Sequence, residues 1–279
     1  MVSDPIFVER DGHRTWLKWH RARRMGSDPV FTGRRIIEGM RLGASVEVDL
    51  VIHAGHGMAV LHNLSLERET TGTGLVRETA PEVLRQLQLR DNEGNPLDDR
   101  VMLLEDLAAL LAAEGAHPDA LLQLDYKEDV DALDPETIAG FAAALAPVAR
   151  SFILSSGDAE AVATLTSAVP GLRIGYDPCH KGAIDQLMAD HDYAAFVAAA
   201  VAASPRAELD YLEYRLVLAA EEEGFDLIGA FHAHGRRVDA YTINRADAAG
   251  IEVAERLLAL KADQITTDDP EGLARGLVR

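Results

Sequence analysis

Two carboxylates and a histidine occupy unexpected positions in one short segment of the chain. Residues 46–63 read VEVDLVIHAGHGMAVLHN, and Glu47 and Asp49 stand where a buried strand would normally carry apolar residues. Residues two apart on a strand point to the same face, so the two carboxylates project together, about 7 Å apart along the chain. His62 ends a second apolar run after a turn-prone AGHG, which predicts a strand that returns the histidine to the same region.

A divalent cation is one explanation for the two carboxylates. Ionised carboxylates on an inner face repel each other and lose their solvation unless a partner compensates them. Oxygen ligands favour Mg²⁺ or Ca²⁺, with Mn²⁺ as a further candidate. In the alternative interpretation, either Glu47 or Asp49 lies near the surface and pairs with an arginine.

A second polar pair follows the same spacing in LLQLDYK, residues 121–127. Asp125 and Lys127 are two residues apart at the end of an apolar run and therefore share one face. Asp125 could supply a third metal ligand, and Lys127 a fixed cation for an anionic group. The alternative is a structural salt bridge between Lys127 and a neighbouring acid.

Two histidines are candidates for acid–base chemistry. His20 closes the predicted strand TWLKWH and is followed by Arg21, and His62 closes the second apolar run. Histidine titrates near neutral pH and can act as a general acid or base, although a single histidine at a strand end is more often structural. The HxxH pair of His53 and His56 lies in a glycine-rich turn, which indicates a solvated tip.

Strand and helix patterns alternate through the chain. About eight strands separated by helices predict parallel βα units, and this length favours a closed (β/α)₈ TIM barrel with residues 1–279 as a single domain. A doubly wound open sheet is the alternative. The expected strands are 15–20, 46–52, 120–127, 151–156, 172–177, 209–214, 237–244 and 262–267, and the expected helices are 33–42, 103–115, 135–149, 159–169, part of 181–203, 225–235 and 248–260.

Composition limits the classes of partner. A net charge of −19 argues against nucleic acid and against stable association with anionic membranes. The single cysteine, Cys179, cannot form an internal disulfide, which fits a reducing compartment. Because no signal-peptide pattern or apolar run of membrane-spanning length is visible, we expect a soluble, cytoplasmic protein. Oligomeric state has no clear signal in the sequence.

Several segments together resemble the glycerophosphodiester phosphodiesterase family, whose fold is a (β/α)₈ barrel of the phospholipase-C-like type. The resemblance runs in order from residue 16 to residue 273. It rests on GASVEVDL (43–50), AVLHNLSLERETTGTG (59–74), LDYK (124–127), VDAYTIN (238–244) and ADQITTDDPEGL (262–273).

This resemblance implies a role for each matching residue. It implies hydrolysis of a small phosphodiester to a phosphomonoester and an alcohol, with one divalent cation and a pair of histidines as acid and base. The implied residues are His20 and His62 for catalysis, Arg21 and Lys127 for the phosphate, Glu47, Asp49 and Asp125 for the metal, and Tyr241 beside the substrate.

The chain also departs from the family pattern. Ala22 replaces the glycine of the H-R-G motif, Val30 falls where the family's E-N-T motif has glutamate, Asn63 replaces an aspartate, and Asp125 replaces a glutamate. Because the three carboxylates and both histidines are retained, we favour an active enzyme whose pocket is altered by these changes. It would act on a glycerophosphodiester or on a sugar phosphodiester, as in the agrocinopine phosphodiesterases that resemble this family. The alternatives are a non-catalytic barrel that binds a phosphorylated ligand and a sphingomyelinase-D-like lyase, which would require membrane-facing loops.

Overall fold

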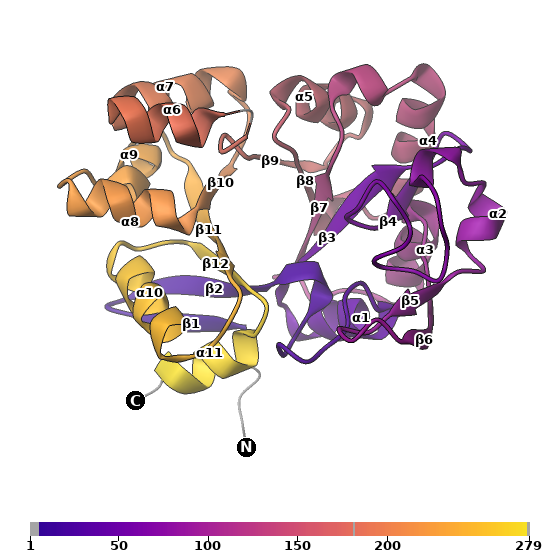
Figure 1. Cartoon of the computed structure of the whole chain (residues 1–279). Helices are drawn as coiled ribbons and strands as arrows, with labels where there is room; N and C mark the ends of the chain where they lie inside the picture. Colours follow the sequence, from indigo (N-terminus) through magenta and orange to yellow (C-terminus); the bar gives the residue numbers. More distant parts are fainter. Residues whose placement is uncertain (1–5, 181, 278–279) are drawn as a thin grey trace.

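A closed barrel of parallel strands forms the centre of the molecule (Figure 1). The computed structural model describes residues 6–180 and 182–277. Within these residues, eight parallel strands pair in chain order, and the last pairs with the first to close the barrel. They are β2 (His13–Trp19), β3 (Ser45–Ile52), β7 (Leu121–Tyr126), β8 (Phe152–Ser155), β9 (Arg173–Tyr176), β10 (Leu209–Glu213), β11 (Arg237–Ile243) and β12 (Gln264–Thr267).

Helices surround the strands on the outside, as Figure 1 shows. The predicted (β/α)₈ barrel is therefore confirmed, and the open-sheet alternative is wrong because β12 pairs with β2. The helices are α1 (Gly33–Leu42), α2 (Pro81–Leu84), α3 (Leu104–Glu114), α4 (Pro135–Leu145), α5 (Ala159–Ala168), α6 (Ala183–Asp190), α7 (Tyr193–Ala203), α8 (Tyr214–Glu222), α9 (Leu227–Ala233), α10 (Ala248–Ala259) and α11 (Pro270–Leu277). No helix among the described residues is both long and apolar enough to cross a bilayer.

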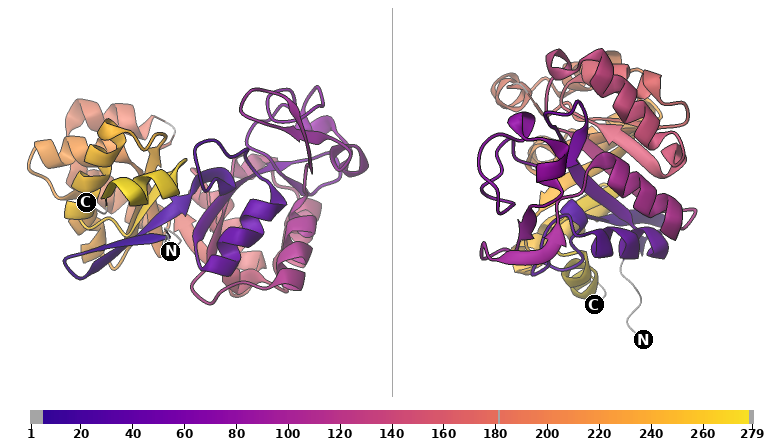
Figure 2. Two further views of the ribbon diagram at one scale, coloured as in Figure 1. Left: turned by 90° about the horizontal axis from the view of Figure 1, so that it is seen from below. Right: turned by 90° about the vertical axis from the view of Figure 1, so that its right-hand side faces the viewer.

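Short antiparallel strands extend the barrel. β1 (Phe7–Arg10) pairs with β2, and β4 (Met58–Val60) pairs with β3, which confirms the predicted returning strand before His62. β5 (Gln88–Arg90) and β6 (Pro96–Arg100) form a separate hairpin. Figure 2 shows the segment between β4 and α3, coloured purple, as a lobe beside the barrel. This lobe, residues 61–103, forms one side of the entrance to the site described below.

Three details of the predicted local structure are wrong. The helix predicted over 135–149 ends at Leu145, two residues before Pro147, which lacks an amide proton to continue it. Residues Tyr214–Glu222 form α8, which the sequence hid because the apolar pattern continues directly from strand β10 into the helix. His53 is buried rather than solvated, whereas His56 is exposed and its Nδ1 lies 2.6 Å from Asp134 Oδ2.

Close packing of α1 on the barrel sets the position of the first two strands. Gly39 of α1 lies so near the barrel that an added Cβ would be 2.6 Å from Val46 Cγ2 and 3.2 Å from Trp19 Cε3. Trp19 and Val46 are fully buried and are paired residues of β2 and β3. The glycine therefore brings the helix close to strand β2, which leads into His20, and to strand β3, which carries Glu47.

We expect Gly39→Ala to lower the free energy of unfolding by about 1–3 kcal/mol, because the extra methyl overpacks the interface between α1 and the barrel. An alanine in an open helical position would instead raise stability by up to about 1 kcal/mol. Urea denaturation measures the difference. Gly140→Ala in α4 is the comparison, since its added Cβ would meet a single atom, His56 O, at 3.3 Å, a tight contact but much less severe than the 2.6 Å at Gly39. A stabilised Gly39→Ala variant would contradict the packing argument.

Candidate active site

A polar cavity of about 260 Å³ opens at the carboxyl ends of the barrel strands. This is the end at which (β/α)₈ enzymes carry their catalytic groups. The structure brings together every residue to which the family resemblance assigns a role. The cavity is lined by His20, Arg21, Glu47, His62, Asp125, Lys127 and Tyr241, and Asp49 lies buried against Arg21 and Lys127.

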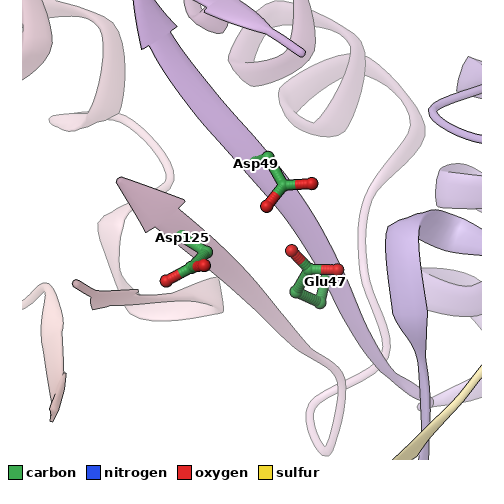
Figure 3. Close-up of side chains that lie close together, drawn as sticks. All are labelled: Glu47, Asp49 and Asp125. Atoms are coloured by element: carbon green, nitrogen blue, oxygen red, sulfur yellow. The ribbon is translucent and has the colours of Figure 1, made fainter. Parts of the chain in front are cut away.

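Three carboxylates converge on one point between β3 and β7 (Figure 3). Asp49 of β3 is paired in register with Asp125 of β7, while Glu47 stands two residues earlier on the same face. One oxygen of each carboxylate lies within 4.8 Å of an oxygen of both others. Glu47 is 4% and Asp49 1% exposed, so water screens little of their repulsion. This arrangement requires positive charge close by.

The ionisation of the two β3 carboxylates differs because their neighbours differ. Burial, and then the negative charge of Asp49, raises the pKa of Glu47 well above its usual range. Burial also opposes ionisation of Asp49, but the positive charges of Lys127 and Arg21 outweigh it and lower the pKa of Asp49. The cluster therefore contains one strongly held negative charge beside a carboxyl group that resists ionisation without a further cation.

Lys127 and Arg21 supply positive charge to the cluster. Lys127 Nζ lies 2.7 Å from Asp49 Oδ1 and also bonds to Asp125, and Arg21 Nε lies 3.2 Å from Asp49 Oδ2. Burial opposes the charge on Lys127, but the carboxylates of Asp125 and Asp49 outweigh it and raise the pKa of the lysine. The predicted salt bridge of Lys127 is thus present, and it lies inside the cavity.

The three carboxylates fit a divalent cation. Both Asp49 oxygens are buried, and neither accepts a hydrogen bond of regular geometry, although they have ion-pair partners. An all-oxygen donor set of this kind suits Mg²⁺, Ca²⁺ or Mn²⁺. An ion there would compensate Glu47 and Asp49 more directly than the two flexible side chains do.

His20 begins the short turn after β2 and is held by a carboxylate. Its Nδ1 lies 2.6 Å from Asp268 Oδ1, and because a carboxylate only accepts, this contact places the proton on Nδ1. Nε2 is left facing the acidic cluster, 4.0 Å from Glu47 Oε2. Asp268 is fixed in turn by Arg23 Nη2 at 2.9 Å and Asn244 Nδ2 at 3.0 Å.

His62 reaches the cavity from the lobe on the other side. Its Nδ1 donates to the amide oxygen of Asn63 at 2.9 Å, which again leaves Nε2 as the nitrogen for the cavity. The buried carboxylate of Glu69 accepts from the backbone amides of both His62 and Asn63, at 3.1 and 3.0 Å. The RETTGTG segment (68–74) therefore holds the loop that carries His62.

The turn that carries Arg21 uses a backbone conformation rare for side-chain-bearing residues. Arg21 has φ +52° and Ala22 has φ +60°, in the left-handed region. In this conformation the backbone amide of Arg21 donates a hydrogen bond to Glu47 Oε2, with an N–O distance of 2.7 Å. Ala22 occupies the position of the glycine in the H-R-G motif, so the turn keeps its shape although an alanine must adopt it.

The comparisons with known proteins agree with this geometry. The sequence profile of the glycerophosphoryl diester phosphodiesterase family matches residues 36–272, most of the chain. The chain belongs to this family. It is therefore a phosphoric diester hydrolase of the glycerophosphodiester phosphodiesterase type. A search of curated proteins finds no match.

Solved structures show the same fold. A protein described as a putative glycerophosphoryl diester phosphodiesterase from Agrobacterium tumefaciens has a TM-score of 0.71 and 21% identity, over 94% of this chain and 96% of that one. A second, from Silicibacter pomeroyi, has a TM-score of 0.69 and 21% identity, over 95% and 93%. A phosphodiesterase from Oleispira antarctica, solved with the product sn-glycerol-3-phosphate, has a TM-score of 0.64 and 18% identity, over 94% and 96%.

Asp125, the metal-ligand candidate that is one methylene shorter than the family's glutamate, is held in place by hydrogen bonds from the floor of the cavity. Ser155 Oγ donates to Asp125 Oδ1 at 2.7 Å, and Gln123 Nε2 donates to Ser155 Oγ at 2.8 Å. Gln123 also accepts from the buried Lys18, whose Nζ lies 2.8 Å from Asp239 Oδ2. This chain of hydrogen bonds crosses the barrel interior and fixes the side chain of Asp125 from the floor of the cavity.

The opposite wall carries a third histidine. His180 Nε2 lies 2.9 Å from Asp177 Oδ2, and both line the cavity with Tyr241. His180 therefore lies at the mouth of the barrel, a position that the sequence did not decide. Burial raises the pKa of Tyr241 and of the Cys179 thiol, so both stay protonated near neutral pH.

Sequence reasoning missed the residues that support the predicted ones. Asp239 and Asn244 lie within VDAYTIN and Asp268 within ADQITTDDPEGL, while Lys18 stands two positions before His20. Polar residues near the carboxyl end of an apolar strand were the available signal. It did not show which of them would meet across the barrel.

We expect Lys18→Met to lower the free energy of unfolding by about 3–5 kcal/mol, because it leaves the fully buried Asp239 without its cationic partner. Adding Asp239→Asn to Lys18→Met removes the uncompensated charge and should recover part of the loss. Urea denaturation of the single and double variants measures both effects. Equal stability of wild type and Lys18→Met would contradict this role.

Proposed function

We propose that the enzyme hydrolyses a small soluble phosphodiester, with a divalent cation and with His20 and His62 as the proton-transfer pair. The observation that supports this most strongly is the convergence of three carboxylates, two histidines and two cationic side chains on one cavity. Its volume of about 260 Å³ suits a small substrate.

Glu47, Asp49 and Asp125 would hold the cation. A divalent ion bound there supplies positive charge to the phosphoryl oxygens and stabilises the charge that develops on them. Compensation of the carboxylates by such an ion would release Lys127 and Arg21 from part of their ion pairing. Both side chains line the cavity and could then neutralise the phosphodiester.

His20 is the better candidate for the base. Its Nδ1 proton is held by Asp268, and a carboxylate stabilises the imidazolium that forms when Nε2 accepts a proton. The nucleophile is water, or a neighbouring hydroxyl of the substrate that first forms a cyclic phosphate. In either route the new bond to phosphorus forms as its proton passes to His20 Nε2.

His62 is the candidate for the acid. It lines the same cavity as His20, and its partner is the neutral amide of Asn63 rather than a carboxylate. Protonated His62 would give its Nε2 proton to the departing alkoxide as the phosphorus–oxygen bond breaks. The products are a phosphomonoester and an alcohol; in the cyclic route the alcohol leaves first, and water then opens the cyclic phosphate to the monoester.

The proposed substrate is a glycerophosphodiester or a sugar phosphodiester, so the phosphate is esterified to glycerol or to a sugar. The Oleispira structure holds sn-glycerol-3-phosphate, which supports a glycerophosphodiester. The polar cavity walls, with Asp177, His180, Asn244 and the ring of Tyr241, offer hydrogen-bond partners to the hydroxyls of either.

We expect His20→Ala and His62→Ala each to lower kcat by about 10²–10⁴-fold with little change in KM, because each removes proton transfer rather than binding. Steady-state hydrolysis of a panel of glycerophosphodiesters and sugar phosphodiesters measures this. An aryl phosphodiester, whose leaving group needs no proton, should restore much of the rate of His62→Ala but not of His20→Ala. The half-exposed His117 is outside the cavity, and His117→Ala is the control. Near wild-type turnover in both cavity variants would refute the assignment.

Removal of divalent ions with a chelator should abolish hydrolysis, and Mg²⁺, Ca²⁺ or Mn²⁺ should restore it. In calorimetric titrations, Glu47→Gln should weaken metal binding about tenfold or more, which corresponds to about 1.4 kcal/mol. Because burial and Asp49 already oppose ionisation of Glu47, the same change should not destabilise the metal-free protein. The exposed Glu252→Gln is the matched control. Unchanged metal affinity in Glu47→Gln would exclude this carboxylate as a ligand.

A further inference from the structure

A second cavity, of about 350 Å³, adjoins the proposed active site. Arg21 lines both cavities, so the two cavities meet at this residue. One wall comes from the segment between β2 and α1, with Arg23 and Val30, and the other from the lobe. We call it the arginine cavity; it is lined by Arg21, Arg23, Val30, Arg68, Glu69, Arg90 and residues 91–94.

Two of the four arginines have no carboxylate partner among residues 6–180 and 182–277. Arg68 makes no hydrogen bond or ion pair with any of these residues, and the side chain of Arg90 donates only to the carbonyl oxygens of Thr70 and Gly94, both at 2.6 Å. Arg21 and Arg23 are paired with Asp49 and Asp268. Arg34 and Arg150 also lack a carboxylate partner among the described residues, but each lines its cavity without a second such arginine. The pair of Arg68 and Arg90 distinguishes the arginine cavity.

The acidic residues of the arginine cavity are used to hold its own loops. Glu69 accepts from the amides of His62 and Asn63, as described above. Asp91 accepts from the amides of Glu93 and Asn95, at 3.0 and 2.7 Å. Only Glu93 projects a carboxylate without such bonds, and it is exposed on the turn. Hydrogen-bond donors therefore exceed free acceptors on the cavity walls.

The position of this cavity relates it to the substrate. Glu69 joins its wall directly to the loop of His62, and Arg21 joins it to Asp49. A phosphodiester bound beside Arg21 and His62 would have one of its two alcohol arms directed toward Arg68 and Arg90. Charge-assisted hydrogen bonds from guanidinium groups favour phosphate and carboxylate over neutral hydroxyls.

We propose that the arginine cavity is a specificity subsite for a phosphodiester whose alcohol arm carries a second anionic group, a phosphate monoester or a carboxylate. This proposal rests on the phosphodiesterase function proposed above. It narrows the substrate class from neutral glycerol or sugar diesters to diesters with an additional negative charge on one arm.

The test compares glycerophosphoglycerol with the same compound carrying a phosphate monoester on its distal hydroxyl. We expect kcat/KM to be about tenfold or more higher for the phosphorylated compound, and this ratio to decrease as salt is added. Arg68→Gln should reduce the ratio about tenfold. The side chain of Arg245 is 82% exposed and lies outside both cavities, so Arg245→Gln is the control and should leave the ratio unchanged. Val30→Glu should reduce the ratio more than Val30→Gln, because only the first adds a negative charge to the wall.

The outcomes separate this subsite from the proposed function. Equal hydrolysis of the two compounds, a preference for the neutral one, or a ratio unaffected by Arg68→Gln would overturn the subsite and leave the phosphodiesterase function standing. If neither compound is hydrolysed, the proposed function fails for them, and calorimetric titration of the same pair decides the subsite. Tighter binding of the phosphorylated compound that is lost in Arg68→Gln would support it, and equal binding would overturn it.

Discussion

The close approach of three buried carboxylates is the constraint on which the site depends. Glu47, Asp49 and Asp125 lie within 4.8 Å of one another, and two of them are almost fully buried. Such a cluster is unstable without positive charge, because repulsion is strong where water is excluded. Lys127 and Arg21 supply that charge in the protein alone. Proposed metal binding and proposed phosphate binding are thus linked, because the two cations that compensate the carboxylates also line the cavity in which we propose that the substrate binds.

The barrel positions this cluster through strand register rather than through loops. Asp49 and Asp125 are register partners, and Ser155 of the next strand braces Asp125. The proposed proton-transfer groups, His20 and His62, stand on the turn after β2 and on the lobe, each fixed by one hydrogen bond at Nδ1. The strands hold the three carboxylates, while the turn and the lobe position the two histidines and line the arginine cavity beside them. Substrate choice can therefore change with the lobe while the carboxylates stay in place.

Much of the site was predictable from sequence because it follows the two-residue period of strands. The pairs Glu47–Asp49 and Asp125–Lys127 and the returning His62 were recognisable by spacing, and the family motifs ordered them along the barrel. The supporting contacts could not be predicted from the sequence, because Lys18, Gln123 and Asp239 meet only across the closed barrel. The helix Tyr214–Glu222 was missed because its apolar face continues the pattern of the strand before it. The roles of the site residues, and the single domain over residues 1–279, stay predictions.

The most direct test of this account is a crystal structure of the enzyme grown with Mn²⁺ and measured for anomalous scattering. The account predicts one strong peak between β3 and β7, with oxygens of Glu47, Asp49 and Asp125 at about 2.0–2.6 Å, the range for hard divalent ions with oxygen ligands. It also predicts that Lys127 Nζ moves away from Asp49. A peak at another position, or none while Lys127 keeps its contacts with Asp49 and Asp125, would contradict the claim that these three carboxylates form a metal site.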